Sequence, residues 1–239
     1  MNKAYMQVDF NSSLAMKYCD LALKSFDRVS DILEIEVIQC VTPSTLLPEL
    51  SDIPNALKKR SPQELASIHS NYHMAKRISQ GERFWVLEHD AYLRPQHEDV
   101  FRMIMSKWKT KDSTLNIGMA NEFWTTIPDI AALYCNRIKK GWPSGPMSLL
   151  HKVTDEYCKN NKTKNTYWPA NRFKNPQWCN KTGVDNNVST AYNKPSVILD
   201  SPITQILDER YGGTVTDRKR SFDVYDKNHH PDVEWVKLP

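Results

Sequence analysis

Apolar residues in the first ninety positions occur in short runs, and between the runs they recur every three or four residues. The runs at residues 4–8 and 84–87, and the stretch LEIEVIQCV at 33–41, predict strands, and the periodic stretches between them predict helices. The first helix is expected at 14–26, with Leu14, Tyr18, Leu21 and Leu23 buried. Because strands alternate with helices, the pattern predicts an α/β fold with a parallel, doubly wound sheet.

The second predicted helix has the clearest boundaries in the chain. Ser61 is placed to cap its start, Pro62 suits the first turn, Glu64 completes a capping box, and Gly81 lies just beyond its end. One buried stripe is expected along it, made of Leu65, Ile68, Tyr72, Ala75 and Ile78. The strand that follows, 84–87, is apolar throughout, which is typical of a strand covered on both faces.

The rest of the chain is less regular. It predicts an amphipathic segment at 100–108, a strand at 115–119, a helix at 128–140 and a last core strand at 197–199, before a polar tail after Arg218. The length of 239 residues suits one domain, 1–239, with a first half at 1–120 and a second half at 121–239.

Composition places the chain among ordinary folded proteins, with 40% apolar and 25% charged residues. It contains neither the apolar core of a secretory signal near its start nor an apolar run long enough to span a bilayer. Its five cysteines form no CxxC pair, so we expect reduced thiols and neither a disulfide framework nor a zinc site. These features favour a cytoplasmic protein without a membrane span.

The stretch FWVLEHDAYL, residues 84–93, leads a buried strand directly into three ionisable groups. Alternation along an extended strand would put Glu88 and Asp90 on one side, where both carboxylates can share a cation, while His89 points away. Oxygen ligands of this kind suit Mg²⁺ or Mn²⁺ better than zinc, and the remaining ligands would be water or substrate phosphates. The alternative is a pair of solvated strand-end carboxylates, with Asp90 pairing with Arg94 or capping the next segment.

The segment LASIHSNYHMAKRISQGERFWVLEHDAYL, residues 65–93, resembles the Rossmann-like A-type (GT-A) glycosyltransferases. In the lipopolysaccharide and procollagen galactosyltransferase-like group, a Ser-His helix precedes an apolar strand and the sequence Leu-Glu-Asp-Asp-Ala. The acidic triplet there is an Asp-x-Asp motif that binds Mn²⁺ and the diphosphate of a nucleotide sugar. Two further segments, LNIGMANEFWTTIPDIAALYCNRI and KPSVILDSPITQI, resemble the group more loosely.

The resemblance implies a mostly parallel, twisted GT-A sheet flanked by helices, with a basic, aromatic-rich C-terminal insertion. It implies transfer of a sugar from a nucleotide-diphosphate sugar, with a UDP-sugar favoured, and 1–120 as the nucleotide-sugar-binding half. Glu88 and Asp90 match the outer motif positions as metal ligands, His89 departs from the usual central aspartate, and His69 matches the family histidine. Donor contacts are therefore expected from these sites and the first two strand ends: Val8, Asp9, Thr42, His69, Glu88, His89 and Asp90.

An inverting reaction also needs a group that removes the acceptor proton. The candidates are Glu122, Asp185, Asp200 and His151. Glu122 is the first choice because it follows a predicted strand within the looser resemblance, although a surface salt bridge is an alternative for each. The sequence leaves open whether the anomeric configuration is inverted or retained.

The acceptor is sought in the stretch between Tyr157 and Val184, which has no acidic residue. Lysines and an arginine alternate there with aromatic rings, and Trp168, Arg172, Lys174 and Trp178 are the candidate acceptor contacts. Cations hold phosphates and rings stack on exposed bases, so the stretch would suit nucleic acid. The alternative is a solvated excursion pinned to the core by its aromatics.

The small size and the Asn/Lys/Met-rich character resemble phage proteins, and T-even-like phages glycosylate hydroxymethylated pyrimidines in their own DNA. Modified DNA is therefore the favoured acceptor. Two alternatives stay open: transfer to lipopolysaccharide or another glycan, and a noncatalytic nucleic-acid-binding α/β protein. His229 and His230 could supply a late metal ligand or be solvated tail residues.

Overall fold

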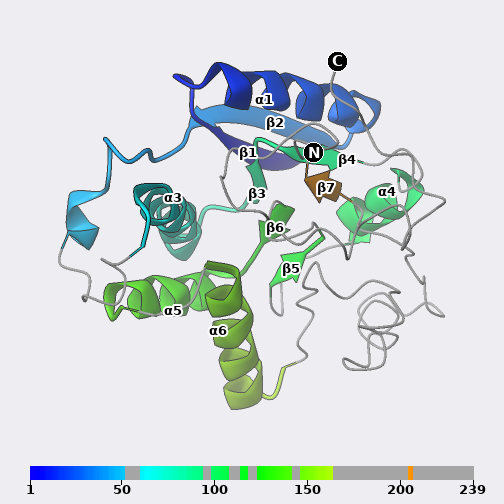
Figure 1. Ribbon diagram of the computed structural model, residues 1–239. Helices are drawn as coiled ribbons and strands as arrows, with labels where there is room; N and C mark the ends of the chain where they lie inside the picture. Colours follow the sequence, from blue (N-terminus) through cyan, green and yellow to red (C-terminus); the bar gives the residue numbers. More distant parts are fainter. Residues whose placement is uncertain are drawn as a thin grey trace, which may run out of the picture.

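We describe a computed structural model of the chain, which covers residues 1–51, 60–93, 98–107, 114–117, 123–141, 146–163 and 204–206. Its centre is a five-stranded sheet with the order β2-β1-β3-β6-β5 (Figure 1). The strands are β1 (Asn2–Val8), β2 (Leu33–Gln39), β3 (Trp85–Glu88), β5 (Leu115–Asn116) and β6 (Phe123–Thr125). A second, two-stranded sheet pairs β4 (Ala91–Leu93) with β7 (Thr204–Ile206).

The sheet is mixed, which corrects part of the predicted parallel topology. β1 pairs in parallel with β2 on one side and with β3 on the other, as predicted. β6 runs antiparallel to both of its neighbours, β3 and β5. Only six residues separate β5 from β6 in the chain, and a parallel connection needs a crossover of a dozen or more, so this pair has to be antiparallel.

Helices cover both faces of the sheet. They are α1 (Ser13–Phe26), α3 (Pro62–Ser79), α4 (Glu98–Lys107), α5 (Pro128–Lys139) and α6 (Pro146–Asn161), with short 3₁₀ turns η1 (Asp27–Val29) and η2 (Pro48–Leu50). One apolar cluster joins α1 and α4 to the sheet, and a second joins α3, α5 and α6 to it. Trp85 and Leu87 of β3 belong to the first cluster, while Phe84 and Val86 belong to the second. β3 is therefore covered on both faces, as its apolar sequence predicted.

The capping signals around α3 are confirmed. The Ser61 hydroxyl accepts a hydrogen bond from the backbone N–H of Glu64 at 3.2 Å, and the Glu64 carboxylate accepts one from the N–H of Ser61 at 3.1 Å. Gly81 follows the helix with a positive φ of 101°, a conformation that favours glycine. These local bonds fix where α3 starts and therefore which of its residues face the sheet edge.

Several predicted elements fall outside the described residues or differ from the prediction. The predicted strand 197–199 and the basic stretch beyond residue 163 lie outside them. β4, β6, β7 and α6 were not predicted. In the part of the chain covered here, no helix is long and apolar enough to cross a membrane.

Candidate functional site

The carboxyl ends of β1, β2 and β3 meet at one edge of the sheet. From β1 the chain crosses to β2 on one side and then returns to β3 on the other side, so the connections diverge between β1 and β3. In open α/β sheets, ligands bind at such a switch point, outside the carboxyl ends of the strands. The register brings Gln7 opposite Glu88 and Val8 opposite Gln39, so these strand ends are level with one another.

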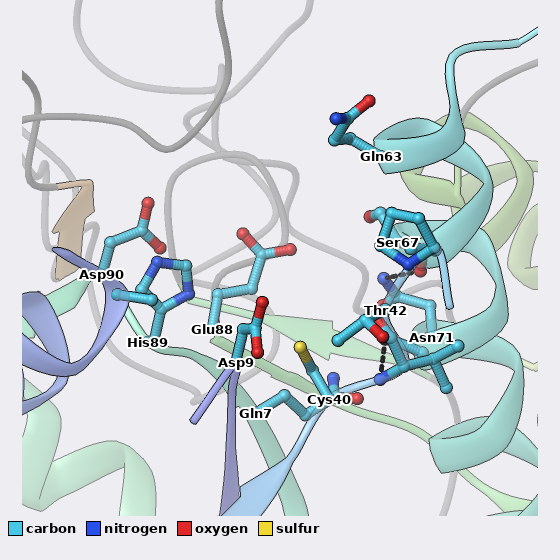
Figure 2. A pocket seen from close by; sticks show the side chains of 15 residues that line it. Gln7, Asp9, Cys40, Thr42, Gln63, Ser67, Asn71, Glu88, His89 and Asp90 are labelled. Carbon is cyan, nitrogen blue, oxygen red and sulfur yellow. Dashed lines mark hydrogen bonds between the residues drawn. The ribbon is translucent and has the colours of Figure 1, made fainter. Parts of the chain in front are cut away.

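A cavity of about 230 Å³ lies at this edge (Figure 2). Three carboxylates line it, one from the residue after β1, Asp9, and two from the end of β3 and the turn behind it, Glu88 and Asp90. Thr42 and Cys40 contribute from the segment after β2. The other lining residues are Gln7, Ala15, Val41, Pro43, Gln63, Ala66, Ser67, Ser70, Asn71 and His89.

The turn after β3 changes the geometry expected from alternation. β3 ends at Glu88, and His89 and Asp90 form a turn before β4 starts at Ala91. His89 therefore lines the same cavity as the two carboxylates, and the prediction that it points away is wrong. Its ring stacks on Tyr18 of α1 with centroids 6.3 Å apart and planes 20° apart.

Two polar atoms of this turn are buried without a hydrogen-bond partner in the described structure: Asp90 Oδ1 and His89 Nε2. Asp90 as a whole is only 6% exposed, so the alternative of a solvated strand-end carboxylate does not describe it. A buried polar atom left unpaired costs about 1–3 kcal/mol, and proteins rarely leave one without a reason. Because both atoms belong to one turn beside the cavity, they are candidate contacts for a bound group.

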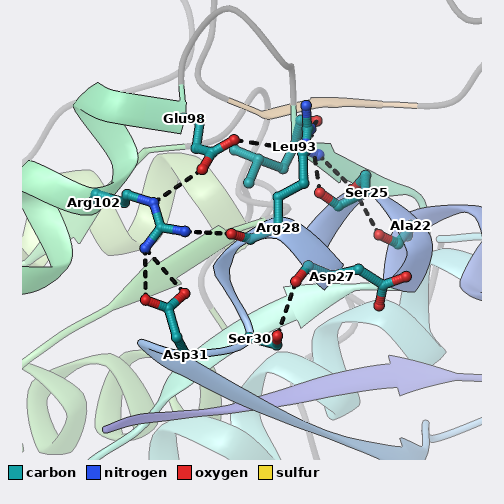
Figure 3. A network of polar contacts seen from close by, with 9 residues as sticks. All are labelled: Ala22, Ser25, Asp27, Arg28, Ser30, Asp31, Leu93, Glu98 and Arg102. Carbon is teal, nitrogen blue, oxygen red and sulfur yellow. Dashed lines mark hydrogen bonds and ion pairs between the residues drawn. The ribbon is translucent and has the colours of Figure 1, made fainter.

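Residues of α1 and η1 hold β4, the strand that starts directly after this turn (Figure 3). The backbone N–H of Leu93 donates to Ser25 Oγ at 2.9 Å, and Arg28 Nη2 donates to the Leu93 carbonyl at 3.0 Å. Arg102 of α4 donates to the backbone carbonyl of Arg28 and forms an ion pair with Asp31 at 2.8 Å. Ser25 at the end of α1 and Arg28 in η1 therefore hold both backbone groups of Leu93, three residues after Asp90.

α3 holds the opposite wall. Ser70 Oγ accepts from the N–H of Val41 at 2.9 Å, so the segment after β2 is attached to the helix. His69 Nδ1 accepts from the N–H of Leu47 at 2.9 Å, and His69 is 2% exposed. Burial lowers the pKa of this imidazole and keeps it in the neutral form that can accept. His69 does not line the cavity but anchors the loop that carries Thr42.

The Cys40 thiol lies in the cavity, where nearby carboxylates affect its pKa. Its pKa is raised to about 11, first by burial and then by the charges of Asp9 and, less strongly, Glu88. Carboxylates from β1 and β3 therefore act on one thiol between them. Of the described cysteines, Cys19, Cys40, Cys135 and Cys158 are free thiols, as predicted.

The remaining predicted residues are distributed as follows. Val8 is fully buried in the core below the cavity, and His151 lies on α6, where Nε2 is 3.7 Å from Asp155 Oδ2. Outside the described residues are Arg94, Glu122, Trp168, Arg172, Lys174, Trp178, Asp185, Asp200, His229 and His230.

Sequence reasoning missed the polar residues of α3 and Gln7. Gln7 is a polar residue within the apolar part of β1, residues 4–8, and it is 7% exposed. Gln63, Ser67 and Asn71 recur every four residues on α3, which is the spacing of one helix face. The buried polar residue and the four-residue spacing can both be seen in the sequence. Only the structure shows that these residues line a cavity.

Comparisons of the chain with protein-family models, with curated protein sequences and with solved structures find no match.

Proposed function

We propose that this chain is a metal-dependent glycosyltransferase that uses a nucleotide-diphosphate sugar as donor, with a GT-A-like arrangement of its Rossmann-like half. The observation that carries the proposal is the buried carboxyl oxygen of Asp90, which has no hydrogen-bond partner among the described residues and lines, together with Glu88, a cavity at the switch point of the sheet. The resemblance of residues 65–93 to A-type glycosyltransferases supports the same reading.

The charges of the cavity favour a cation. Three carboxylates line it, and its described lining contains no lysine or arginine. An anionic diphosphate would be repelled from such a wall unless a cation lay between the two. A nucleotide sugar therefore fits this cavity only together with a divalent metal ion.

The residues fit a loosely held ion rather than a closed metal centre. Across the described ranges, no three side chains of His, Cys, Asp or Glu converge into a metal-binding group. Proteins commonly bind Mg²⁺ through one or two carboxylates, and waters and substrate phosphates are its other ligands. Glu88 and Asp90 would be the protein ligands, and Mn²⁺ or Mg²⁺ is the proposed cofactor.

The residues of the cavity then have two tasks, to hold the metal ion and to bind the donor. When bound, the metal ion supplies Lewis-acid stabilisation of the charge on the departing nucleoside diphosphate. Glu88 has two carboxylate oxygens, so it can bind the metal ion through one and, like Asp9, accept a hydrogen bond from a donor hydroxyl through the other. The turn before β4 keeps Asp90 and His89 against the donor. For the group that removes the acceptor proton, we keep the candidates named from the sequence, with Glu122 as the first choice. The acceptor likewise remains a prediction from the basic stretch, with modified DNA favoured over a glycan.

Donor hydrolysis tests the proposal without knowledge of the acceptor. Wild-type protein is incubated with Mn²⁺ and a panel of nucleotide sugars that starts with UDP-glucose and UDP-galactose, and release of the nucleoside diphosphate is measured. Asp90→Asn should lower the rate by at least about a hundredfold, or about 2.7 kcal/mol. Glu34→Gln, an exposed change near the start of β2, should leave the rate unchanged. Absence of turnover with every donor, or an unaffected Asp90→Asn variant, would refute the proposal.

A further inference from the structure

The wall of the cavity opposite the carboxylates is built from neutral polar side chains of one helix face. Gln63, Ser67 and Asn71 follow at four-residue intervals along α3 and all line the cavity. Figure 2 shows them on one side, with Asp9 and Glu88 on the other. The cavity thus has one acidic wall and one uncharged, hydrogen-bonding wall.

Asn71 is fixed more firmly than its neighbours. It is 5% exposed, and its Nδ2 donates to the Ser67 carbonyl at 3.0 Å. That bond uses one of the two amide N–H donors, and the side chain can still donate once and accept through Oδ1. Gln63 and Ser67 are exposed at the mouth, so the row runs from the opening of the cavity toward its floor.

The composition of the lining limits what lies against this row. Without lysine or arginine among the described lining residues, the row is poorly suited to a bare phosphate group. The row itself contains no aromatic side chain on which a nucleobase could stack, an interaction worth about 1–3 kcal/mol per base, and the ring of His89 lies with the carboxylates and is stacked on Tyr18. A ring bearing hydroxyl groups is different, because each hydroxyl can donate to a carboxylate and accept from an amide or another hydroxyl.

We infer that Gln63, Ser67 and Asn71 form the specificity wall for a saccharide ring of the donor, whose vicinal hydroxyls bridge from α3 to the carboxylates of Asp9 and Glu88. The inference rests on the proposed function and adds to it the residues that recognise the donor by hydrogen bonds. The saccharide ring is either the ribose of the nucleotide or the sugar to be transferred, and the recognition chemistry is the same for both.

Binding measurements separate the two sources. Dissociation constants for UDP and for UDP-glucose and UDP-galactose are measured in the presence of Mn²⁺, for wild type and for Ser67→Ala, Asn71→Leu and Gln63→Leu. Loss of one neutral hydrogen bond should weaken binding about two- to tenfold. Equal weakening for UDP and for the sugar nucleotides identifies the ribose, and weakening confined to the sugar nucleotides identifies the transferred sugar.

Ser79→Ala is the matched control, because Ser79 lies at the other end of the same helix and its hydroxyl donates only to the Lys76 carbonyl. If wild type binds a sugar nucleotide and all three wall variants bind it equally well, the inference is wrong and the proposed function stands. If wild type binds none of these nucleotides, the proposed function is refuted, and the inference falls with it.

Discussion

Ser25→Ala tests whether α1 holds the turn that carries Asp90. Ser25 is 4% exposed and Leu93 is fully buried, and the two are joined by the bond from the Leu93 N–H to Ser25 Oγ at 2.9 Å. Removing the hydroxyl leaves a buried N–H without a partner, which costs about 1–3 kcal/mol. Because β4 starts directly after Asp90, the same change should also loosen the Asp90 turn.

Urea unfolding measures the first effect, and Mn²⁺-dependent donor hydrolysis well below the unfolding temperature measures the second. The free energy of unfolding should fall by about 1–3 kcal/mol and the hydrolysis rate should fall as well, while Ser25→Thr, which keeps the hydroxyl, should retain most of both. Ser79→Ala is the stability control, because it also removes a hydroxyl bonded to a carbonyl three residues earlier, but no long-range contact. If Ser25→Ala and Ser79→Ala cannot be distinguished in either assay, the reasoning is refuted.

Three further predictions concern other parts of the structure. Ser61→Ala removes the capping box of α3 and should lower the free energy of unfolding by about 0.5–2 kcal/mol in urea titrations; a change below about 0.3 kcal/mol would contradict the role of the cap. Burial lowers the pKa of His69 below its ordinary 6.5, so the unfolded chain binds the proton first. The stability that neutral His69 contributes should therefore be fully present above about pH 6.5 and be lost as the pH falls through the folded-state pKa. His69→Asn should reduce the pH dependence of unfolding curves between pH 7.5 and 5.5, with a part remaining from His73, whose pKa is also lowered by burial; an unchanged slope would count against the role of His69. Cys40, with its pKa raised to about 11, should react slowly with iodoacetamide at pH 8, and Asp9→Asn, which removes one cause of the shift, should accelerate the labelling measured by peptide mass spectrometry. Equal labelling rates in the two proteins would show that the Asp9 charge does not reach the thiol.

The strands and helices that could be predicted are those whose signals are local. The capping box of Ser61 and Glu64 and the apolar run of β3 need only neighbouring residues to be recognised. By contrast, β4 and β6 have three residues each, which is too short for a periodic pattern. Their pairing depends on distant segments of the chain.

The buried face of α1 shows how residue size can mislead. Of the four large residues predicted to be buried, only Tyr18 is, and Leu14 is 40% exposed. The helix instead buries small residues, including Ala15, Cys19 and Ala22, next to Phe26. Small side chains let the helix approach the sheet closely, so packing rather than hydrophobicity alone selects the face.

The candidate site could be predicted in part. Glu88 and Asp90 follow an apolar strand, which placed them at a sheet edge, and the cavity brings them together with Asp9 and Thr42. The turn that redirects His89 could not be foreseen, because alternation holds only while the strand continues. The cavity wall formed by Gln63, Ser67 and Asn71 of α3 was not predicted, because these residue types are common on any exposed helix face.

The most direct test of the central claim is a titration of Mn²⁺ followed by electron paramagnetic resonance, with and without UDP. We predict that wild-type protein binds Mn²⁺ weakly alone and much more tightly with UDP, that Glu88→Gln and Asp90→Asn both abolish the enhancement, and that Glu34→Gln retains it. Enhancement that survives in both cavity variants, or none in wild type, would contradict the claim that these two carboxylates hold a metal ion for a nucleotide.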